Sequence, residues 1–532
     1  MYYEGQLRQR GGRIGLGDVF GVFTRHIMPR IVKAGTNFFK QKATTLAPKA
    51  LKAGIGLVSD IAQKRNLKQA LRERGKRLLA NAINDPGPPP KRQKRAGTRT
   101  VKKPSRGRPR KKAQPRVRAY SPEKLIQNEV DHAYHVELTP HNSILPGNNL
   151  IFHLEGGSDF TDLSNTYLAV EIQMTSSEGV AVAPDAKACP INNIFHSMWS
   201  QIQVSLKDCV ISHPSPNYAY RAYLENLLNY SKDSKETWME NIGFYMDQPA
   251  AFDSEANAAL PKRRDLITGK KTLRLKGKLS TDVGAQPLLI PSHTDITLTL
   301  TPQRPEFLIQ NFDVANTSYK IDILSAKLSV RKVKLYPSKV AEFEKQIAKA
   351  PIRLPIAQVK VTTVSIPSGM SSYHQNSIFS GELPNYVVIG LVKNASYTGA
   401  PNKNPFNFVH ETLNYIQLKV NEQLIPTYAI TPKFADANFT EAYESLYHVI
   451  GRHGQDWSNG LTLSDYKGGS ALYGFTLNND TLCRHDSVNL QGQVDITLKF
   501  DSALSDTMTI VIYSSTMGNI IIDQHRNVLL DI

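Results

Sequence analysis

The chain has 532 residues, a formal net charge of +19 and a pI near 9.5, so it is long enough for two or three domains and its charge suits an anionic partner. Its three cysteines, Cys189, Cys209 and Cys483, are far apart and odd in number, which argues against a disulfide framework. No apolar run approaches the roughly 18 residues that cross a bilayer, and the first residues do not resemble a signal peptide, so we expect a chain that is neither membrane-spanning nor secreted.

The positive charge is concentrated at the N-terminus. Residues 1–120 contain 31 Lys and Arg against 5 Asp and Glu, a net charge of +26, whereas the rest of the chain contains 34 against 41, a net charge of −7. A folded domain that binds nucleic acid with its own surface would be basic itself. We therefore expect the first fifth of the chain to attract an anionic partner and the remainder to have a different role.

Residues 1–84 are predicted to form a basic, amphipathic arm of discontinuous helices. Phe23, Ile27 and Ile31 share one apolar stripe, which Pro29 interrupts, and shorter stripes follow it. Two interpretations are open at this point. The helices pack loosely on a partner, or they make transient contact with a membrane interface, because a cationic face opposite Phe and Leu can lie among lipid headgroups.

Residues 85–120 are rich in proline, lysine and arginine and contain almost no large apolar side chain. Such a segment cannot bury enough surface to offset the entropy of the chain, so we expect a disordered linker. Its basic clusters, KRQKR and KKPSRGRPRKK, supply the predicted nucleic-acid-binding residues. These are Lys91, Arg92, Lys94, Arg95, Lys102, Lys103, Arg106, Gly107, Arg108, Pro109, Arg110, Lys111 and Lys112.

The four residues from Arg106 to Pro109 resemble the core of an AT-hook. Glycine lets the backbone approach the floor of the minor groove, proline keeps the chain extended, and arginine enters the narrow groove of A·T-rich DNA. Neutralisation of phosphates without sequence preference is the alternative, and the sequence leaves both open. The KRQKR cluster also has the composition of a nuclear import signal.

After about residue 120 the sequence is predicted to be all-β. Apolar residues alternate with polar ones, which is typical of strands with one buried face, and turn residues separate the runs. Helical patterns between the runs are rare, which favours stacked antiparallel sheets over a parallel βαβ arrangement. The alternating positions include Leu168, Val170, Ile172 and Met174; Ile202, Val204 and Leu206; Leu273, Leu275 and Leu279; Ile296, Leu298 and Leu300; Leu324, Ala326, Leu328 and Val330; Ile416, Leu418 and Val420; and Val494, Ile496, Leu498 and Phe500.

Three local patterns recur in the same order, which indicates an internal duplication. IQVSLKDCVI from Ile202 is echoed by IQLKVNEQLI from Ile416, and DITLTL from Asp295 is echoed by DITLKF from Asp495. A helical pattern follows each of the first two segments. Its apolar residues are Tyr220, Tyr223, Leu224 and Leu227 in the first copy and Tyr443, Leu446, Tyr447 and Ile450 in the second.

The duplication divides the body into two units of roughly 200 residues, which we expect to be two β-sandwiches side by side. We predict them at residues 121–340 and 341–532. A short helix and a proline-bounded linker are predicted between Pro337 and Leu354. Long insertions, at residues 231–270 and 453–482, are expected to be tower or contact loops.

Enzyme signatures are missing from the sequence. The histidines are scattered, the cysteines lack the spacing of a metal site, and the glycines near the N-terminus do not follow a predicted strand. No pair of carboxylates is singled out by its context. We therefore expect no catalytic, cofactor-binding or metal-binding residues, and a structural role for the body.

Three segments carry a resemblance to a known family. They are NNIFHSMWSQIQVSLKD from Asn192, LPNYVVIGLVKNASYTGAPNKNPFNF from Leu383, and QGQVDITLKFDSALSDTMTIVIYSSTMGNIIIDQHRNVLLDI from Gln491. Over about residues 125–532 the chain resembles the double jelly-roll, hexon-like major capsid proteins of Maverick/Polinton elements and adinto- and adomavirus-like viruses. The arm segment RGGRIGLGDVFGVFTRHIMPRIVKAG resembles small basic core or minor capsid polypeptides of the same elements, which are commonly separate chains.

The resemblance implies two tandem jelly rolls and a homotrimer whose six sandwiches form a pseudo-hexagonal capsomer in a capsid lattice. It further implies DNA bound by the arm, possible penton-like and minor capsid partners, and a place in the virion capsid after assembly in the host nucleus. Two other interpretations remain. One is a non-capsid nuclear DNA-binding adaptor whose β-sandwich body binds proteins, and the other is a carbohydrate- or receptor-binding sandwich.

Overall fold

The computed structural model describes residues 129–313, 318–477 and 491–531. The chain divides into two units, Met1–Arg116 and Val117–Ile532, and the fold described below belongs to the second. The predicted helical arm, the predicted linker and all thirteen predicted nucleic-acid-binding residues lie outside the described residues. Within the described ranges, no helix is long and apolar enough to cross a membrane.

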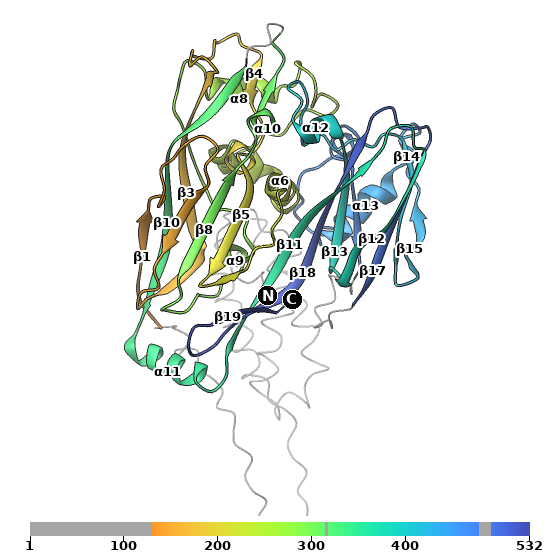
Figure 1. Cartoon of the computed structure of the whole chain (residues 1–532). Helices are drawn as coiled ribbons and strands as arrows, with labels where there is room; N and C mark the ends of the chain where they lie inside the picture. Colours follow the sequence, from red (N-terminus) through yellow and green to blue (C-terminus); the bar gives the residue numbers. More distant parts are fainter. Residues whose placement is uncertain (1–128, 314–317, 478–490, 532) are drawn as a thin grey trace, which may run out of the picture. The chain divides into compact units, whose positions relative to one another are not determined.

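The first half of the body is an eight-stranded sandwich of two antiparallel sheets, shown in orange to green in Figure 1. One sheet has the order β1-β10-β3-β7 and the other β2-β8-β5-β6. A small third sheet pairs β4 with β9. The strands are β1 (Val130–Leu138), β2 (Leu150–Leu154), β3 (Phe160–Ser176), β4 (Ala188–Pro190), β5 (Trp199–Leu206), β6 (Cys209–Val210), β7 (Leu273–Gly277), β8 (Ile296–Pro302), β9 (Ile309–Asn311) and β10 (Tyr319–Leu335).

The second half repeats the arrangement in teal and blue (Figure 1). Its sheets have the orders β11-β18-β13-β16 and β12-β17-β14-β15, and a last strand, β19, pairs with β18. The strands are β11 (Ile352–Ile366), β12 (Ser372–Glu382), β13 (Tyr386–Lys393), β14 (Leu413–Val420), β15 (Gln423–Ile430), β16 (Leu472–Thr476), β17 (Gln491–Phe500), β18 (Met508–Ile522) and β19 (Val528–Asp531).

The strand order identifies both halves as jelly rolls. When the eight sandwich strands of each half are numbered along the chain, both halves give one sheet of order 1-8-3-6 and one of order 2-7-4-5. This is the double Greek-key connection of a jelly roll. The predicted fold class, two tandem jelly rolls in an all-β body, is therefore confirmed by the chain's own topology.

Short helices occupy equivalent connections in the two jelly rolls. The two longest within the jelly rolls, α6 (Tyr218–Asn229) and α13 (Thr440–Val449), each follow the fifth sandwich strand and precede the sixth. The other helices are α5 (Ile194–Ser197), α7 (Lys232–Lys235), η4 (Trp238–Ile242), α8 (Ala259–Asp265), α9 (Asp282–Ala285), α10 (Pro305–Leu308), α11 (Pro337–Ile347), α12 (Asn394–Thr398) and α14 (Leu463–Lys467).

The connection between the jelly rolls is the helix α11. Pro337 is its first residue, where a fixed φ suits a helix and no backbone donor is lost. The predicted short helix of this region is confirmed, and the expected boundary between residues 340 and 341 falls within it.

All three predicted echoes fall on equivalent elements. The first pair lies on β5 and β14, the helical pair on α6 and α13, and the last pair on β8 and β17. The equivalence extends to single hydrogen bonds: Asp295 accepts one from the amide of Gly156 at 2.7 Å, and Asp495 accepts one from the amide of Ser377 at 2.9 Å. Each aspartate therefore ties the seventh strand of its jelly roll to the chain around the second.

A second pair of equivalent contacts was not foreseen. His153 on β2 is opposite Thr297 on β8, and its Nδ1 is 3.1 Å from the threonine hydroxyl. His374 on β12 is opposite Thr497 on β17, with the same two atoms 2.9 Å apart. Both threonines belong to the repeated Asp-Ile-Thr tripeptide. The repeat in the sequence therefore indicated that the two threonines are equivalent, but it did not indicate their histidine partners.

The alternating residues mostly face the core between the sheets, as predicted. Leu324 is an exception, because its side chain is 48% exposed. The pairing of β10 with β3 shifts register between Ile323 and Ser325, so Leu324 lies at a β-bulge and points outward. Ala326 and Leu328 then return to the buried face. The expectation that Leu324 shares the dry face of its strand was wrong for this reason.

Candidate assembly surfaces

The two jelly rolls meet along one edge of the second. Among the described strands, β11 pairs only with β18, so its other edge carries backbone groups that no described strand pairs with. The first jelly roll supplies those partners: Asp282 accepts a hydrogen bond from the amide of Val359 at 3.1 Å, and Ser215 and Asn217 donate to the carbonyl of Val361 at 2.7 and 3.2 Å. This junction therefore caps the free edge of β11.

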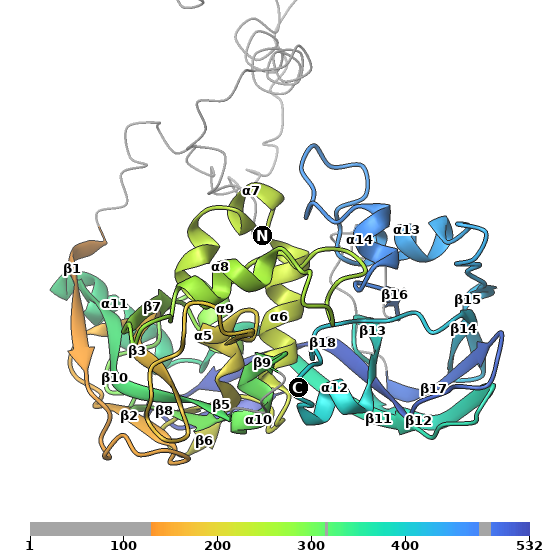
Figure 2. The same cartoon turned by 90° about the horizontal axis from the view of Figure 1, so that it is seen from above.

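Helix α6 fills the space between the two jelly rolls (Figures 1 and 2). The ring of Tyr223 stacks on Phe406 of the second jelly roll, with centroids 4.1 Å apart and planes 3° from parallel. The ring of Tyr220 stacks on Tyr397 at 5.8 Å and meets Phe408 edge-on. Large buried aromatic surfaces with defined geometry hold a contact more firmly than area alone would suggest.

An ion pair of α6 also lies at the junction. The guanidinium of Arg221 contacts Asp282 at 2.7 Å and Glu225 at 3.0 Å. Burial opposes the charged form, but these carboxylates outweigh it and hold the pKa of Arg221 above its ordinary value. Because Asp282 also accepts the amide of Val359, the ion pair fixes the carboxylate that caps β11.

Asp247, in the connection between α6 and β7, is the centre of a second buried network. One of its carboxylate oxygens accepts hydrogen bonds from Arg263 at 2.9 Å and Asn257 at 2.8 Å. The other accepts from Asn192 and from Asn404, both at 3.1 Å. Since Asn404 belongs to the second jelly roll, this carboxylate joins three segments of the first jelly roll to the second.

The insertions expected to be tower or contact loops contact each other across the junction. In residues 231–270, the amine of Lys235 donates to the carbonyl of Asn459 at 2.7 Å and also to that of Leu227. Burial lowers the pKa of Lys235 to about 7. The amide of Ala250 donates to the carbonyl of Gly468 at 2.6 Å. These two hydrogen bonds link the insertions of the two jelly rolls across the junction.

The C-terminal hairpin forms a further tie between the jelly rolls. The guanidinium of Arg526, in the turn between β18 and β19, donates to the carbonyl of Ser292 in the first jelly roll at 2.9 Å and also contacts Glu344 on α11. Nearby, the amine of Lys207 donates to the carbonyl of His525 at 3.2 Å. The two jelly rolls are thus joined at the helices, along β11 and at the hairpin.

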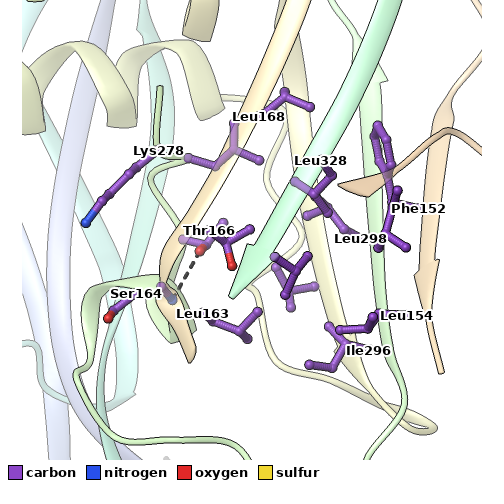
Figure 3. Close-up of a pocket in the computed structure, with 16 residues that line it drawn as sticks. Phe152, Leu154, Leu163, Ser164, Thr166, Leu168, Lys278, Ile296, Leu298 and Leu328 are labelled. Carbon is purple, nitrogen blue, oxygen red and sulfur yellow. Dashed lines mark hydrogen bonds between the residues drawn. The ribbon is translucent and has the colours of Figure 1, made fainter. Parts of the chain in front are cut away.

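A cavity of about 50 Å³ lies between the two sheets of the first jelly roll. Figure 3 shows its mostly apolar lining, which also includes the polar side chains of Ser164 and Thr166, while the amine of Lys278 points away. A space of this size holds only a few water molecules, so it is a packing defect rather than a site for a larger ligand.

In the described ranges, no group of three His, Cys, Asp or Glu side chains has the arrangement of a metal site. The thiol of Cys189 is buried, and burial raises its pKa, whereas Cys209 is half-buried. Cys483 lies outside the described residues.

Comparison with known proteins gives distant likenesses. No protein-family model matches the chain. An uncharacterized protein of Caenorhabditis elegans is 26% identical over 330 residues, which cover 60% of this chain and 77% of the worm protein. Three viral structures also resemble the fold: the PBCV-1 capsid (12% identity, 75% of this chain and 96% of that one, TM-score 0.49), the Faustovirus major capsid protein (9%, 75% and 90%, 0.48) and the mavirus major capsid protein (11%, 81% and 97%, 0.46).

Identities this low and TM-scores below 0.5 do not by themselves assign a fold. The strand order of the chain defines it as a double jelly roll. The junction could not be foreseen from the sequence. Asp247, Arg263 and Asp282 belong to no motif there, and each meets its partners only in the folded structure.

Proposed function

We propose that this chain is a structural major capsid protein, of the kind found in Maverick/Polinton elements and adinto- and adomavirus-like viruses, and not an enzyme. Three copies form a pseudo-hexagonal capsomer. The arm, residues 1–84, and the linker, residues 85–120, lie inside the shell and neutralise packaged DNA. The shell is built by the jelly rolls of residues 121–340 and 341–532, and assembly takes place in the host nucleus.

The observation that carries the proposal is the head-to-tail packing of two like units. The sheet of the first jelly roll that contains β5 and β6 faces the second jelly roll, and the equivalent sheet of the second, containing β14 and β15, lies at the far end of the body (Figures 1 and 2). A contact between unlike surfaces can repeat from copy to copy, and it closes into a ring when the rotation permits. Three chains then supply six units.

Native mass spectrometry and electron microscopy of the full-length protein test this proposal. The expected result is a trimer, seen in projection as a particle with a hexagonal outline. A particle that stays monomeric at every concentration and salt condition used for assembly contradicts the proposal and favours the adaptor. Glycan binding by an isolated monomer would favour the receptor-binding sandwich instead.

The predicted role of the linker leads to a separate test. Each phosphate contact contributes about 0.9 to the slope of log K against log salt for duplex DNA. Replacing Arg106, Arg108 and Arg110 with glutamine in the full-length protein is therefore expected to reduce that slope by about 2.7. The measurement is DNA affinity between roughly 50 and 200 mM salt.

A matched control uses three basic residues of the body. Replacing Lys232, Lys327 and Arg353, whose side chains are 69%, 59% and 63% exposed, with glutamine removes the same charge and is expected to leave the slope unchanged. Equal losses from both triple variants would show that DNA is bound by total charge rather than by the linker. A loss confined to A·T-rich duplexes would assign minor-groove reading to the segment from Arg106 to Pro109.

A further inference from the structure

The two equivalent helices of the jelly rolls are buried to different extents. Nine of the 12 residues of α6 are buried, because the first jelly roll covers one side of the helix and the second jelly roll covers the other. Only four of the ten residues of α13 are buried, and Glu441, Glu444 and His448 are exposed. Of the α13 residues that correspond to the junction residues of α6, Glu444 is exposed, whereas Tyr443 and Leu446 are covered by the second jelly roll itself.

The equivalent first strands differ in the same way. Only three of the 15 residues of β11 are exposed, since the first jelly roll packs along it. Seven of the nine residues of β1 are exposed, and β1, like β11, pairs with a described strand on one side alone. Val130 and Tyr134, at 45% and 40% exposure, are large apolar or aromatic side chains on this uncovered edge.

The equivalent fifth strands complete the pattern. Ile211, which directly follows β6, is fully buried at the junction, where its carbonyl accepts a hydrogen bond from Gln358, whereas its counterpart in the repeat, Ile425 on β15, is half-buried. On β15, the counterpart of β6, Tyr428 is 84% exposed and Leu424 is 52% exposed. Tyr428 is the most exposed large apolar or aromatic side chain in the described part of the chain, in an edge strand where such residues are usually avoided.

These uncovered surfaces lie at opposite ends of the body. In both Figure 1 and Figure 2, β1 is at one extreme and β15, beside α13, is at the other, with α6 between them. We name the first surface the β1 edge, residues 130–138, and the second the β15 face, which comprises β15 and the exposed side of α13. Among the described residues, the junction inside the chain covers one member of each pair of equivalent surfaces more fully than the other.

We propose that the β15 face of one copy packs against the β1 edge of a second copy, repeating between chains the contact that joins the two jelly rolls within a chain. Tyr428 anchors this contact. The inference rests on the proposed capsomer and identifies the surfaces that hold it together. The second copy is the occupant because the same two kinds of surface already bind each other at the junction.

The β1 edge has a recess suited to an aromatic anchor. A groove of about 730 Å³ opens between β1 and β2, lined by Tyr134, Val136, His153 and Asp159 among others. The hydroxyl of Tyr134 donates to Asp159 at 2.8 Å and so holds one wall in place. An aromatic side chain that enters a concave, partly apolar recess is the usual centre of a protein interface.

A charge reversal at the anchor tests the proposal. In the full-length protein, Tyr428→Glu is expected to raise the dissociation constant between copies at least roughly 30-fold, as for an interface hot spot. The measurement is the mass distribution against concentration by native mass spectrometry. Val180→Glu is the matched control: Val180 is 58% exposed in the turn after β3, away from both surfaces, and the change is expected to leave association unaltered.

Cross-linking supplies a second measurement that does not depend on weakening the contact. The double variant Tyr134→Cys and Tyr428→Cys is expected to form disulfide-linked dimers and trimers on mild oxidation, whereas each single variant is not. A trimer unaffected by Tyr428→Glu and not cross-linked by the pair overturns this inference but leaves the proposed capsomer intact. A wild-type protein that never associates removes both.

Discussion

Replacing Asp247 with alanine is expected to lower the free energy of unfolding by about 3–5 kcal/mol, the usual cost of leaving a buried charge without its partner. The side chains of Asp247 and Arg263 are 0% and 1% exposed, so water cannot replace the lost carboxylate. The change also removes an acceptor from the side-chain amides of Asn192, Asn257 and Asn404, which all donate to Asp247. Denaturant unfolding at one fixed protein concentration measures the effect.

The matched control is Asp265→Ala. Asp265 also pairs with an arginine, Arg264, at 3.3 Å, but its side chain is 68% exposed, so its removal is expected to change stability by less than about 0.5 kcal/mol. If Asp247→Ala cost no more than this control, the network would not be holding the two jelly rolls together. Pairing Asp247→Ala with Asn404→Ala in a double-mutant cycle isolates the part of the effect that crosses the junction.

Stability is expected to fall in acid because of His196. The residue is 3% exposed on α5, and burial lowers its pKa to about 3 from the ordinary 6.5. The hydroxyl of Tyr218 accepts from the amide of Ser280 and lies 2.9 Å from Nδ1 of His196, so the buried, uncharged ring has a hydrogen-bond partner. The unfolded chain therefore binds a proton first, and the stability present above pH 6.5 is lost as the pH falls toward 3.

The size of this effect follows from the pKa difference. Each pH unit below 6.5 costs about 1.4 kcal/mol, so the loss from this one group between pH 6.5 and 5 is about 2 kcal/mol. Unfolding free energies at pH 7.5 and 5 are expected to differ by about 2 kcal/mol less in His196→Asn than in the wild type. The exposed His132, replaced in the same way, is the control, and an equal pH dependence in all three proteins would contradict the assignment to His196.

Local patterns predicted the strands and the duplication because each depends on neighbouring residues. The alternation of Ile202, Val204 and Leu206 indicates a strand with one buried and one exposed face, regardless of which elements pack against it. Leu324 escaped this reasoning, since a β-bulge depends on how β10 pairs with a strand about 150 residues earlier. Alternation in the sequence therefore identifies a strand but does not identify a break in its register.

The junction was beyond sequence reasoning for a related reason. Tyr220 and Tyr223 were predicted correctly as the apolar side of a helix, but the same pattern in Tyr443 and Leu446 gave no sign that one helix is covered on both sides and the other is not. That difference depends on which units become neighbours. The predicted DNA-binding residues lie outside the described part of the chain and stay a prediction.

Because the two jelly rolls pair head-to-tail within one chain, the stability of each building block and the affinity between building blocks depend on different contacts. In a ring of identical single sandwiches, one interface determines both how stable each building block is and how readily the blocks come apart. Here the inner contact belongs to one polypeptide and does not depend on concentration, whereas the outer surfaces differ from it in sequence, for example Arg221 in α6 and Glu444 in α13. In the proposed capsomer, substitutions can therefore weaken or strengthen association between chains while the pair within each chain stays intact.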